Sequence, residues 1–281
     1  MSSLYPGFAQ ASATAKTTTG REHIAILLAT YNGGEMLAAQ LESIGRQSHR
    51  DWSLIVSDDG SYDDTTNIVR AFAERQSNNR VALIRGPAQG SAQNFLSLLR
   101  AAGRAPFAAF ADQDDVWFGD KLSRAIKSLR ATSLPAIYGS STLITDENLQ
   151  PLRTSIQFKR PCGFQNALVQ NIAGGNTMVL NRKALDALQP ASLLAKGIVS
   201  HDWWCYQMVT GMGGEMLYDP TPSLYYRQHG KNQIGANDTV PAQISRMKRL
   251  MRGDFAHWRN AHFQALAAAD KWLRRDARAI L

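Results

Sequence analysis

Short apolar segments alternate with amphipathic segments over the first 130 residues of the chain. Apolar runs of four to six residues that end in polar turns are typical of buried parallel strands, and they occupy 24–29, 52–56, 81–84 and 107–111. Between them, apolar residues recur at helical spacing after Gly34, after an N-cap at Asp63 or Asp64, and from Gly90. This order predicts an α/β fold with a mainly parallel central sheet and helices on both faces.

The alternation weakens after Leu129. Strands are predicted at 136–138, 143–144, 176–180 and 223–226, a loop at 150–165, and helices from Arg182 and over 201–209. No segment with the composition of a linker interrupts the chain before about Asn237, so residues 23–237 are predicted to form one domain with halves 23–130 and 131–237. Residues 1–22 lack the apolar core of a secretory signal and are predicted to be a disordered tail.

Residues 238–281 are predicted to form a basic helical extension. Apolar residues recur at helical spacing from Ile244 to Leu273, and residues 241–281 hold nine Lys or Arg against three Asp. Two interpretations remain open: an amphipathic helix on an anionic membrane surface, and a helix packed on the domain or on a second subunit. Because most of the net charge of +8 lies in this extension, the main fold is not predicted to bind nucleic acid.

The composition is that of a globular protein. Of the 281 residues, 44% are hydrophobic and 19% are charged, and no apolar stretch approaches the length of about 20 residues that spans a bilayer. Cys162 and Cys205 lack the spacing of a metal site and are predicted to be reduced thiols of a cytoplasmic protein.

Three carboxylates fall within four residues directly after the apolar run 107–111. They belong to Asp112, Asp114 and Asp115, and Gln113 lies among them. Like charges at the end of a buried strand repel one another unless a cation lies between them. Carboxylate oxygens suit Mg²⁺ or Mn²⁺, which proteins hold together with the phosphates of a substrate. The alternative is an acidic loop that caps the next helix.

Polar residues also follow two other predicted strands, as Thr30-Tyr31-Asn32 and Asp58-Asp59. The carboxyl ends of parallel strands meet at one edge of a sheet, where ligands bind. We therefore predict that these three segments form one metal-dependent site for a phosphorylated ligand.

Five motifs in this order resemble family 2 glycosyltransferases of the GT-A fold. They are Ala29-Thr30-Tyr31-Asn32-Gly33, Ser57-Asp58-Asp59-Gly60-Ser61, Asp112-Gln113-Asp114-Asp115-Val116-Trp117, His201-Asp202-Trp203-Trp204 and Tyr226-Arg227-Gln228-His229-Gly230-Lys231-Asn232. The third and fifth look most like bacterial rhamnosyltransferase-type enzymes that build surface polysaccharides. The resemblance covers about residues 23–235. It implies inverting transfer of a sugar, with rhamnose a candidate, from a dTDP or UDP donor to a lipid-linked or polysaccharide acceptor of O-antigen or capsule synthesis.

The resemblance also implies the donor site. Thr30, Tyr31 and Asn32 would contact base and ribose, and Asp59 with Asp58 would accept a hydrogen bond from the base. A carboxylate acceptor fits uracil or thymine, whose N3 carries a proton. Gln113 would bind the donor, and Arg227 suits bidentate contact with phosphate. Gly90 and Asn94 match a donor-side loop and helix start, with packing as the alternative.

For the metal, the resemblance implies Asp114 as direct ligand of Mg²⁺ or Mn²⁺. Asp112 would be shared between ribose and metal, and His229 would be a further contact to metal or diphosphate. Asp115 would support these carboxylates or cap the following helix.

Asp202 is the implied catalytic base, since direct displacement at the anomeric carbon needs a group that takes the proton of the acceptor hydroxyl. An N-cap role for Asp202 is compatible with catalysis. On the acceptor side, the resemblance implies Asn176, and Trp203 and Trp204 would form an apolar platform or pack in the core.

Two other functions compete with this one. A sugar-1-phosphate nucleotidyltransferase would need a basic residue in the loop after the first strand, which Thr30-Tyr31-Asn32-Gly33-Gly34 lacks. A non-catalytic sugar-nucleotide-binding or scaffold subunit would not need Asp202 and the full acid cluster. The enzyme is expected in the cytoplasm, at the inner face of the membrane if the extension binds lipid. The sequence gives no oligomeric state.

Overall fold

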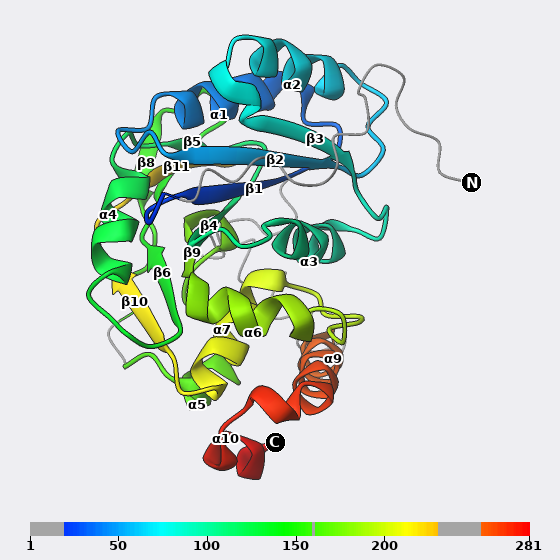
Figure 1. Ribbon diagram of the computed structural model, residues 1–281, viewed down its shortest axis with the longest axis vertical. Coiled ribbons are helices and arrows are strands. Elements are labelled where there is room, and N and C mark those ends of the chain that lie inside the picture. The colour runs from blue at the N-terminus through cyan, green and yellow to red at the C-terminus, as the bar shows by residue number, and fades with distance from the viewer. Residues whose placement is uncertain (1–19, 159–160, 230–253) are drawn as a thin grey trace.

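A seven-stranded sheet lies at the centre of the computed structural model, which describes residues 20–158, 161–229 and 254–281 (Figure 1). The strand order is β10-β6-β9-β4-β1-β2-β3. The four strands β4, β1, β2 and β3 are parallel to one another, and β9 runs antiparallel to both β4 and β6. The bounds are β1 Ile24–Thr30, β2 Trp52–Asp58, β3 Val81–Arg85, β4 Phe107–Ala111, β6 Ala136–Ser140, β9 Val179–Asn181 and β10 Glu215–Asp219. The predicted α/β fold is confirmed.

Alternate residues of β1 enter two separate hydrophobic layers. Ile24, Ile26 and Leu28 pack on one face of the sheet, whereas Ala25 and Leu27 pack on the other. Both faces of the strand are therefore buried, which is why its sequence is a continuous apolar run and not an alternating one. All seven residues of β1 are buried.

Helices cover both faces of the sheet. One layer contains α1 Gly34–Gly45, α2 Thr65–Glu74 and α4 Lys121–Leu129, and the other contains α3 Ser91–Ala101, α5 Phe164–Ala167, α6 Arg182–Ala191, α7 His201–Gly211, α9 Asp254–Ala268 and α10 Arg275–Ile280. Three short 3-10 helices, η1 Ser77–Asn79, η2 Gly175–Thr177 and η3 Asp270–Trp272, complete the described helices. In Figure 1, α3, α6 and α7 lie on the opposite side of β1 from α1 and α2.

A second, four-stranded sheet has the order β5-β11-β7-β8. Its strands are β5 Val116–Trp117, β7 Leu143–Thr145, β8 Pro151–Thr154 and β11 Leu224–Arg227. Because β5 follows the acid cluster directly and pairs with β11, the small sheet brings the Tyr-Arg-Gln-His motif at 226–229 back to that cluster.

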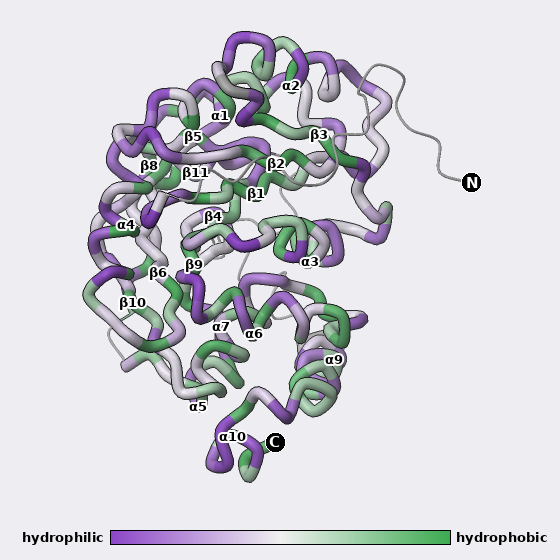
Figure 2. Tube along the Cα trace, in the orientation of Figure 1, coloured by the Kyte–Doolittle hydropathy of each residue, from purple (hydrophilic) through white to green (hydrophobic). Residues whose placement is uncertain are grey.

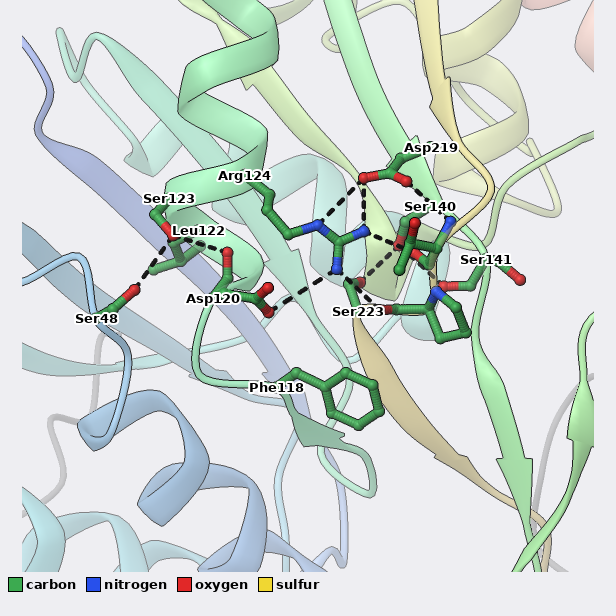
Figure 3. A network of polar contacts seen from close by, with 12 residues as sticks. Ser48, Phe118, Asp120, Leu122, Ser123, Arg124, Ser140, Ser141, Asp219 and Ser223 are labelled. Carbon is green, nitrogen blue, oxygen red and sulfur yellow. Dashed lines mark hydrogen bonds and ion pairs between the residues drawn. The ribbon is translucent and has the colours of Figure 1, made fainter.

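Arg124 of α4 fastens the segment that leads into β11 (Figure 3). Its guanidinium donates to Asp219 Oδ2, at 2.5 Å from Nη2, and to the carbonyl oxygens of Thr221 and Pro222. Tyr138 donates its hydroxyl to the same carboxylate oxygen at 2.8 Å. The arginine holds the pKa of Asp219 below its usual value despite partial burial, so the pair stays charged at neutral pH. The segment before β11 is thus tied to both α4 and β6.

Two local predictions are wrong. The loop predicted at 150–165 contains the start of the short helix α5 and the strand β8, which pairs with β7 alone among the described strands. The strand predicted at 176–180 begins instead at Val179, since Gly175 to Thr177 form a 3-10 turn. Asn176 lies in this turn, where its side-chain amide donates to Asp115.

The C-terminal helices pack on the domain, as one of the two open interpretations predicted. Ala265, Leu266, Ala269, Leu273 and Ala277 are buried in the same hydrophobic layer as α3, α6 and α7. Figure 2 shows that α9 carries both hydrophobic and hydrophilic residues along its length. Met247 and Met251, which belong to the predicted amphipathic stripe, lie outside the described residues, as do the boundary near Asn237 and residues 1–19 of the predicted tail.

Among the helices that the structure describes, none combines the length and the apolar character needed to span a bilayer. Both cysteines are free thiols, with Cys205 buried and Cys162 half-buried.

Candidate active site

Gln113 clamps the loop that follows β1. Its Oε1 accepts from the Thr30 hydroxyl at 2.7 Å and from the Tyr31 backbone amide at 2.9 Å, and its Nε2 donates to the Tyr31 carbonyl at 3.2 Å. A side chain at position 33 would place its Cβ only 2.4 Å from Gln113 Oε1, so the end of the Gln113 side chain would have to shift. Thr30 and Gln113 therefore form one polar unit at adjacent strand ends, as the fold prediction required.

Asn32 joins the loops that follow β1 and β2. Its backbone amide donates to Ser61 Oγ at 2.8 Å, and its Oδ1 accepts from the Tyr62 amide at 3.1 Å. Its φ of 49° lies in the left-handed region, which asparagine tolerates better than most residues. Beside it, Tyr31 is 52% exposed and meets Tyr62 edge-on at 6.4 Å between ring centroids. Two aromatic rings thus border the site.

The two aspartates at the end of β2 have different roles. Asp58 is fully buried, and its carboxylate accepts from the amides of Gly60 and Ser61 and from the Ser61 hydroxyl. These contacts show that Asp58 organises the turn, and its contact with the donor stays a prediction. Asp59 is half-buried and accepts from the Ala88 amide at 3.0 Å. Burial raises the pKa of its carboxyl, with backbone donors opposing the shift and Asp58 adding to it.

Asn94 is buried at the start of α3 and donates its side-chain amide to the Ser57 carbonyl at 3.1 Å. It therefore ties α3 to β2, which is the packing alternative. Gly90, with φ of 85°, precedes the helix and has open space around the position of a Cβ.

The acid cluster lies at the end of β4. Ligand atoms of Asp112, Asp114 and Asp115 all lie within 4.8 Å of one another. His229 Nε2 lies 2.7 Å from Asp114 Oδ2, and these two side chains are 9% and 18% exposed. The structure therefore brings together the residues predicted as metal ligands, Asp112, Asp114 and His229, from segments 115 positions apart in the chain.

Asp115 is fully buried, and Asn176 and Lys121 surround it. Asn176 donates its side-chain amide to Asp115 Oδ2 at 2.6 Å, and its carbonyl accepts from Lys121 Nζ at 2.7 Å. Asp115 does not cap α4, because Asp120 occupies the N-cap position of that helix. Its other oxygen, Oδ1, is buried without a hydrogen-bond partner among the described residues. A buried carboxylate oxygen without a donor favours a nearby cation.

Lys121 is a buried cation that the sequence interpretation missed. Its ammonium lies 4.5 Å from the centroid of the Trp117 ring. Burial lowers the pKa of Lys121 to about 7, opposed chiefly by the negative charge of Asp115. The sequence could have indicated this cation, because Lys121 lies on the same buried side of α4 as Leu122, Ala125 and Leu129. Lysine is rarely buried there unless it is paired with an acidic group.

The electrostatics of the cluster favour a bound cation. Burial raises the pKa of Asp112 to about 8, and the negative charges of Asp114 and Asp202 add to the shift. Burial also raises the pKa of Asp115 well above its usual value, and the negative charges of Asp114 and Asp112 add to this shift. Carboxylates that repel one another at this spacing fit a hard divalent ion such as Mg²⁺ or Mn²⁺, which accepts oxygen ligands.

Asp202 lies in the first turn of α7, after the N-cap residue Ser200. Its Oδ2 accepts from the Gly175 amide at 2.8 Å, and its Oδ1 accepts from the Ser200 hydroxyl and from the Trp203 amide. Three donors therefore fix the carboxylate in one orientation, near enough to Asp112 for its charge to affect that residue.

The tryptophans after Asp202 are buried. Trp204 is 0% exposed within the hydrophobic layer, so it packs in the core, which is the packing alternative for this residue. Trp203 is 6% exposed and donates its indole N–H to the Ala167 carbonyl at 2.7 Å. Arg227 lies at the end of β11, where its guanidinium donates to the Glu147 carbonyl at 3.4 Å.

Comparison with known proteins gives the site a context. The model of the family described as glycosyl transferase family 2 matches residues 25–188. The dTDP-rhamnosyl transferase RfbG of Shigella flexneri is 29% identical over 228 residues, which are 78% of this chain and 78% of that protein. The UDP-Glc:alpha-D-GlcNAc-diphosphoundecaprenol beta-1,3-glucosyltransferase WfgD of Escherichia coli is 30% identical over 58% of this chain and 62% of that protein.

The fold agrees with these matches. The mannosyltransferase PcManGT from Pyrobaculum calidifontis, solved with GDP-Man and Mn²⁺, superposes with a TM-score of 0.56 over 92% of this chain and 78% of that chain. At 18% identity the likeness concerns the fold alone, which is GT-A.

Replacing Gly33 by alanine should displace the Gln113 clamp. Because the new Cβ would overlap Gln113 Oε1 and shift it from its hydrogen-bond partners, Gly33→Ala should lower the free energy of unfolding by about 1 kcal/mol, measured by urea denaturation. Gly163→Ala is the matched control, since no atom lies within 4 Å of its Cβ position, and it should change stability by about 0.5 kcal/mol at most. Equal effects in the two variants would contradict the clamp.

Proposed function

The chain belongs to glycosyl transferase family 2, and we propose that it is an inverting, metal-dependent enzyme that moves a sugar from a dTDP or UDP donor to a lipid-linked or polysaccharide acceptor. The observation that carries this proposal is the convergence of the acid cluster 112–115 with Asp202 and His229 at one edge of the sheet. A scaffold subunit would not need this arrangement, and a nucleotidyltransferase would need a basic residue in the loop after β1, which residues 30–34 lack.

Donor recognition is proposed at the ends of β1 and β2. Asp59 directly follows β2 and remains partly exposed, so it would accept the N3 proton of thymine or uracil. Tyr31 and Tyr62 would provide aromatic surface for the base, and Thr30, Asn32 and Gln113 would shape the ribose side. The first donor to test is dTDP-rhamnose, because the Shigella flexneri relative is named for that transfer.

Asp202 is proposed as the catalytic base. The acceptor hydroxyl would attack the anomeric carbon, its proton would pass to Asp202, and the bond to the departing diphosphate would break as the new bond forms. A single displacement of this kind inverts configuration at the anomeric carbon. The donors from Gly175, Ser200 and Trp203 would hold the carboxylate in place during the transfer.

Asp114, Asp112 and His229 are proposed to hold a divalent cation, either Mg²⁺ or Mn²⁺. When bound, such an ion neutralises charge on the diphosphate leaving group as a Lewis acid. Asn176 and Lys121 would keep Asp115 in place behind these ligands. Arg227, at the end of β11, would contribute positive charge to the binding of the donor diphosphate.

Peripheral attachment to the inner face of the membrane is proposed for the C-terminal segment. The Escherichia coli relative carries a diphosphoundecaprenol acceptor in its name, and a lipid-linked acceptor would require access to the bilayer. Arg259, Arg275 and Arg278 are exposed on the described part of this segment. Exposed basic residues attract anionic headgroups.

Removing the carboxylate of Asp202 should abolish transfer while donor binding survives. Asp202→Asn keeps the size of the side chain but cannot take a proton, so the turnover rate should fall by about 10²–10⁴-fold with little change in the Kd of dTDP. Both can be measured with Mn²⁺ by product assay and calorimetry. Asp186→Asn removes an exposed carboxylate of α6 as the control. Turnover retained in Asp202→Asn would remove this residue from the mechanism.

Metal affinity should rise with pH. The pKa of Asp112 is raised to about 8 by burial and by its negative neighbours, so below pH 8 the metal-free protein holds a proton that cation binding must release. The affinity for Mn²⁺ should therefore increase between pH 6 and pH 8, by up to about tenfold per pH unit, and then level off. Calorimetry in buffers of different ionisation enthalpy measures the released proton. Asp112→Asn should bind more weakly and lose this dependence; a flat profile in the wild type would count against the site.

Loss of basic side chains from the C-terminal segment should weaken binding to anionic vesicles. Replacing Arg259, Arg275 and Arg278 by glutamine should reduce sedimentation with phosphatidylglycerol vesicles by about tenfold or more, since each charge near the surface contributes about 1 kcal/mol. A control with equal loss of charge replaces the exposed Arg46, Arg75 and Arg104. Equal sedimentation of the two variants would reject the membrane role.

A further inference from the structure

His262 of α9 is a fully buried histidine outside the proposed donor and metal sites. Its Nδ1 lies 2.9 Å from Gln207 Oε1 of α7, and its Nε2 lies 3.4 Å from the backbone amide of Val199. An amide N–H can only donate, so Nε2 accepts and Nδ1 carries the proton that is donated to Gln207. The contacts therefore select one neutral tautomer, consistent with burial lowering the pKa of His262 to about 4.

His262 contacts two residues at the start of α7, Val199 and Trp203. Its ring packs on Trp203 with 4.4 Å between ring centroids. Val199 precedes Ser200, and Trp203 follows Asp202, so the two contacts of His262 lie on either side of Ser200 and Asp202. Ser200 and Trp203 both donate to the Asp202 carboxylate. The charge of Asp202 also reaches the imidazole, where it opposes the lowering of the pKa.

A hydrogen-bonded chain extends this contact to α5. Gln207, which accepts from His262, donates its side-chain amide to the Ala167 carbonyl at 3.2 Å. The same carbonyl accepts the indole N–H of Trp203. His262, Gln207 and Trp203 thus join α9, α7 and α5 through buried polar groups that have no water to replace a lost partner.

We propose that His262 is a positioning residue for the transfer reaction: the C-terminal segment, through this imidazole, sets the first turn of α7 and so the place of the Asp202 carboxylate. The inference rests on the proposed role of Asp202 as base. It gives the C-terminal segment a part in catalysis that is separate from any contact with a membrane.

The test compares His262→Phe with His262→Gln and Leu266→Ala in the full chain. Phenylalanine keeps an aromatic ring against Trp203 but makes neither hydrogen bond, whereas glutamine can still accept from the Val199 amide. Leu266 is fully buried on the same helix, and its truncation loosens the packing of α9 without removing a partner of residues 199–203.

Hydrogen–deuterium exchange and hydrolysis of dTDP-rhamnose and UDP-glucose with Mn²⁺ are measured for each variant, at a temperature where all are folded. In His262→Phe, amides in peptides covering 199–204 should exchange about tenfold faster than in the wild type, a size that one lost hydrogen bond supports. Its hydrolysis rate should fall by a similar factor with the Kd of dTDP unchanged. His262→Gln should recover part of both effects, and Leu266→Ala should show neither.

Unchanged exchange at 199–204 in His262→Phe, or the same exchange in Leu266→Ala, would overturn the proposal. Asp202→Asn is run in parallel to separate the two levels of inference. If Asp202→Asn hydrolyses donor at the wild-type rate, the proposed base is wrong; if it is inactive while His262→Phe behaves as wild type, only the positioning role is wrong.

Discussion

Repulsion among four carboxylates at one edge of the central sheet is the constraint on which the rest of the site depends. Asp112, Asp114 and Asp115 converge after β4, and the charge of Asp202 on α7 reaches Asp112. The chain offsets only part of this charge, because the ammonium of Lys121 is itself so desolvated that its pKa falls to about 7. Folding therefore creates an excess of negative charge that protons or a divalent cation must relieve. This excess explains why neutral donors such as Asn176 and the Gly175 amide surround the carboxylates.

The position of the site could be predicted because its fold is built from local units. Each parallel strand and the helix after it are close in sequence. The apolar runs at 24–29, 52–56 and 107–111 are therefore enough to predict that the three polar segments after them lie at one edge of the sheet. Non-local pairings were harder to foresee. Among the described strands, the edge strand β8 pairs with β7 alone. Its residues are mostly exposed, as the residues of a loop are, so the sequence did not distinguish it from a loop. The turn from Gly175 to Thr177 could not be predicted from the glycines alone. Its Asn176 bonds to Asp115, which lies 61 positions earlier in the chain.

Roles within the site could be predicted only where residue type restricts them. The group of Asp112 and Asp114 could be predicted because carboxylates at converging strand ends repel one another, and His229 was added to it by the motif at 226–229. A carboxylate that holds a turn and one that holds a ligand have the same pattern, so Asp58 and Asp59 could be separated only by their burial. Trp204 likewise can be assigned to the core only from the burial of α7 in the structure.

The C-terminal helices have a consequence for the order in which the protein folds. Leu266, Leu273 and Ala277 complete the hydrophobic layer that also contains Ala25 and Leu27 of the first strand. On the ribosome, the face of the sheet covered by α3, α6 and α7 therefore remains incompletely covered until residues near 277 have been synthesised. The opposite layer, formed by α1, α2 and α4, draws most of its members from the first 140 residues and can form much earlier. A nascent chain of this protein thus exposes one hydrophobic face of the sheet until late in synthesis, and exposed hydrophobic surface of this kind is what chaperones bind.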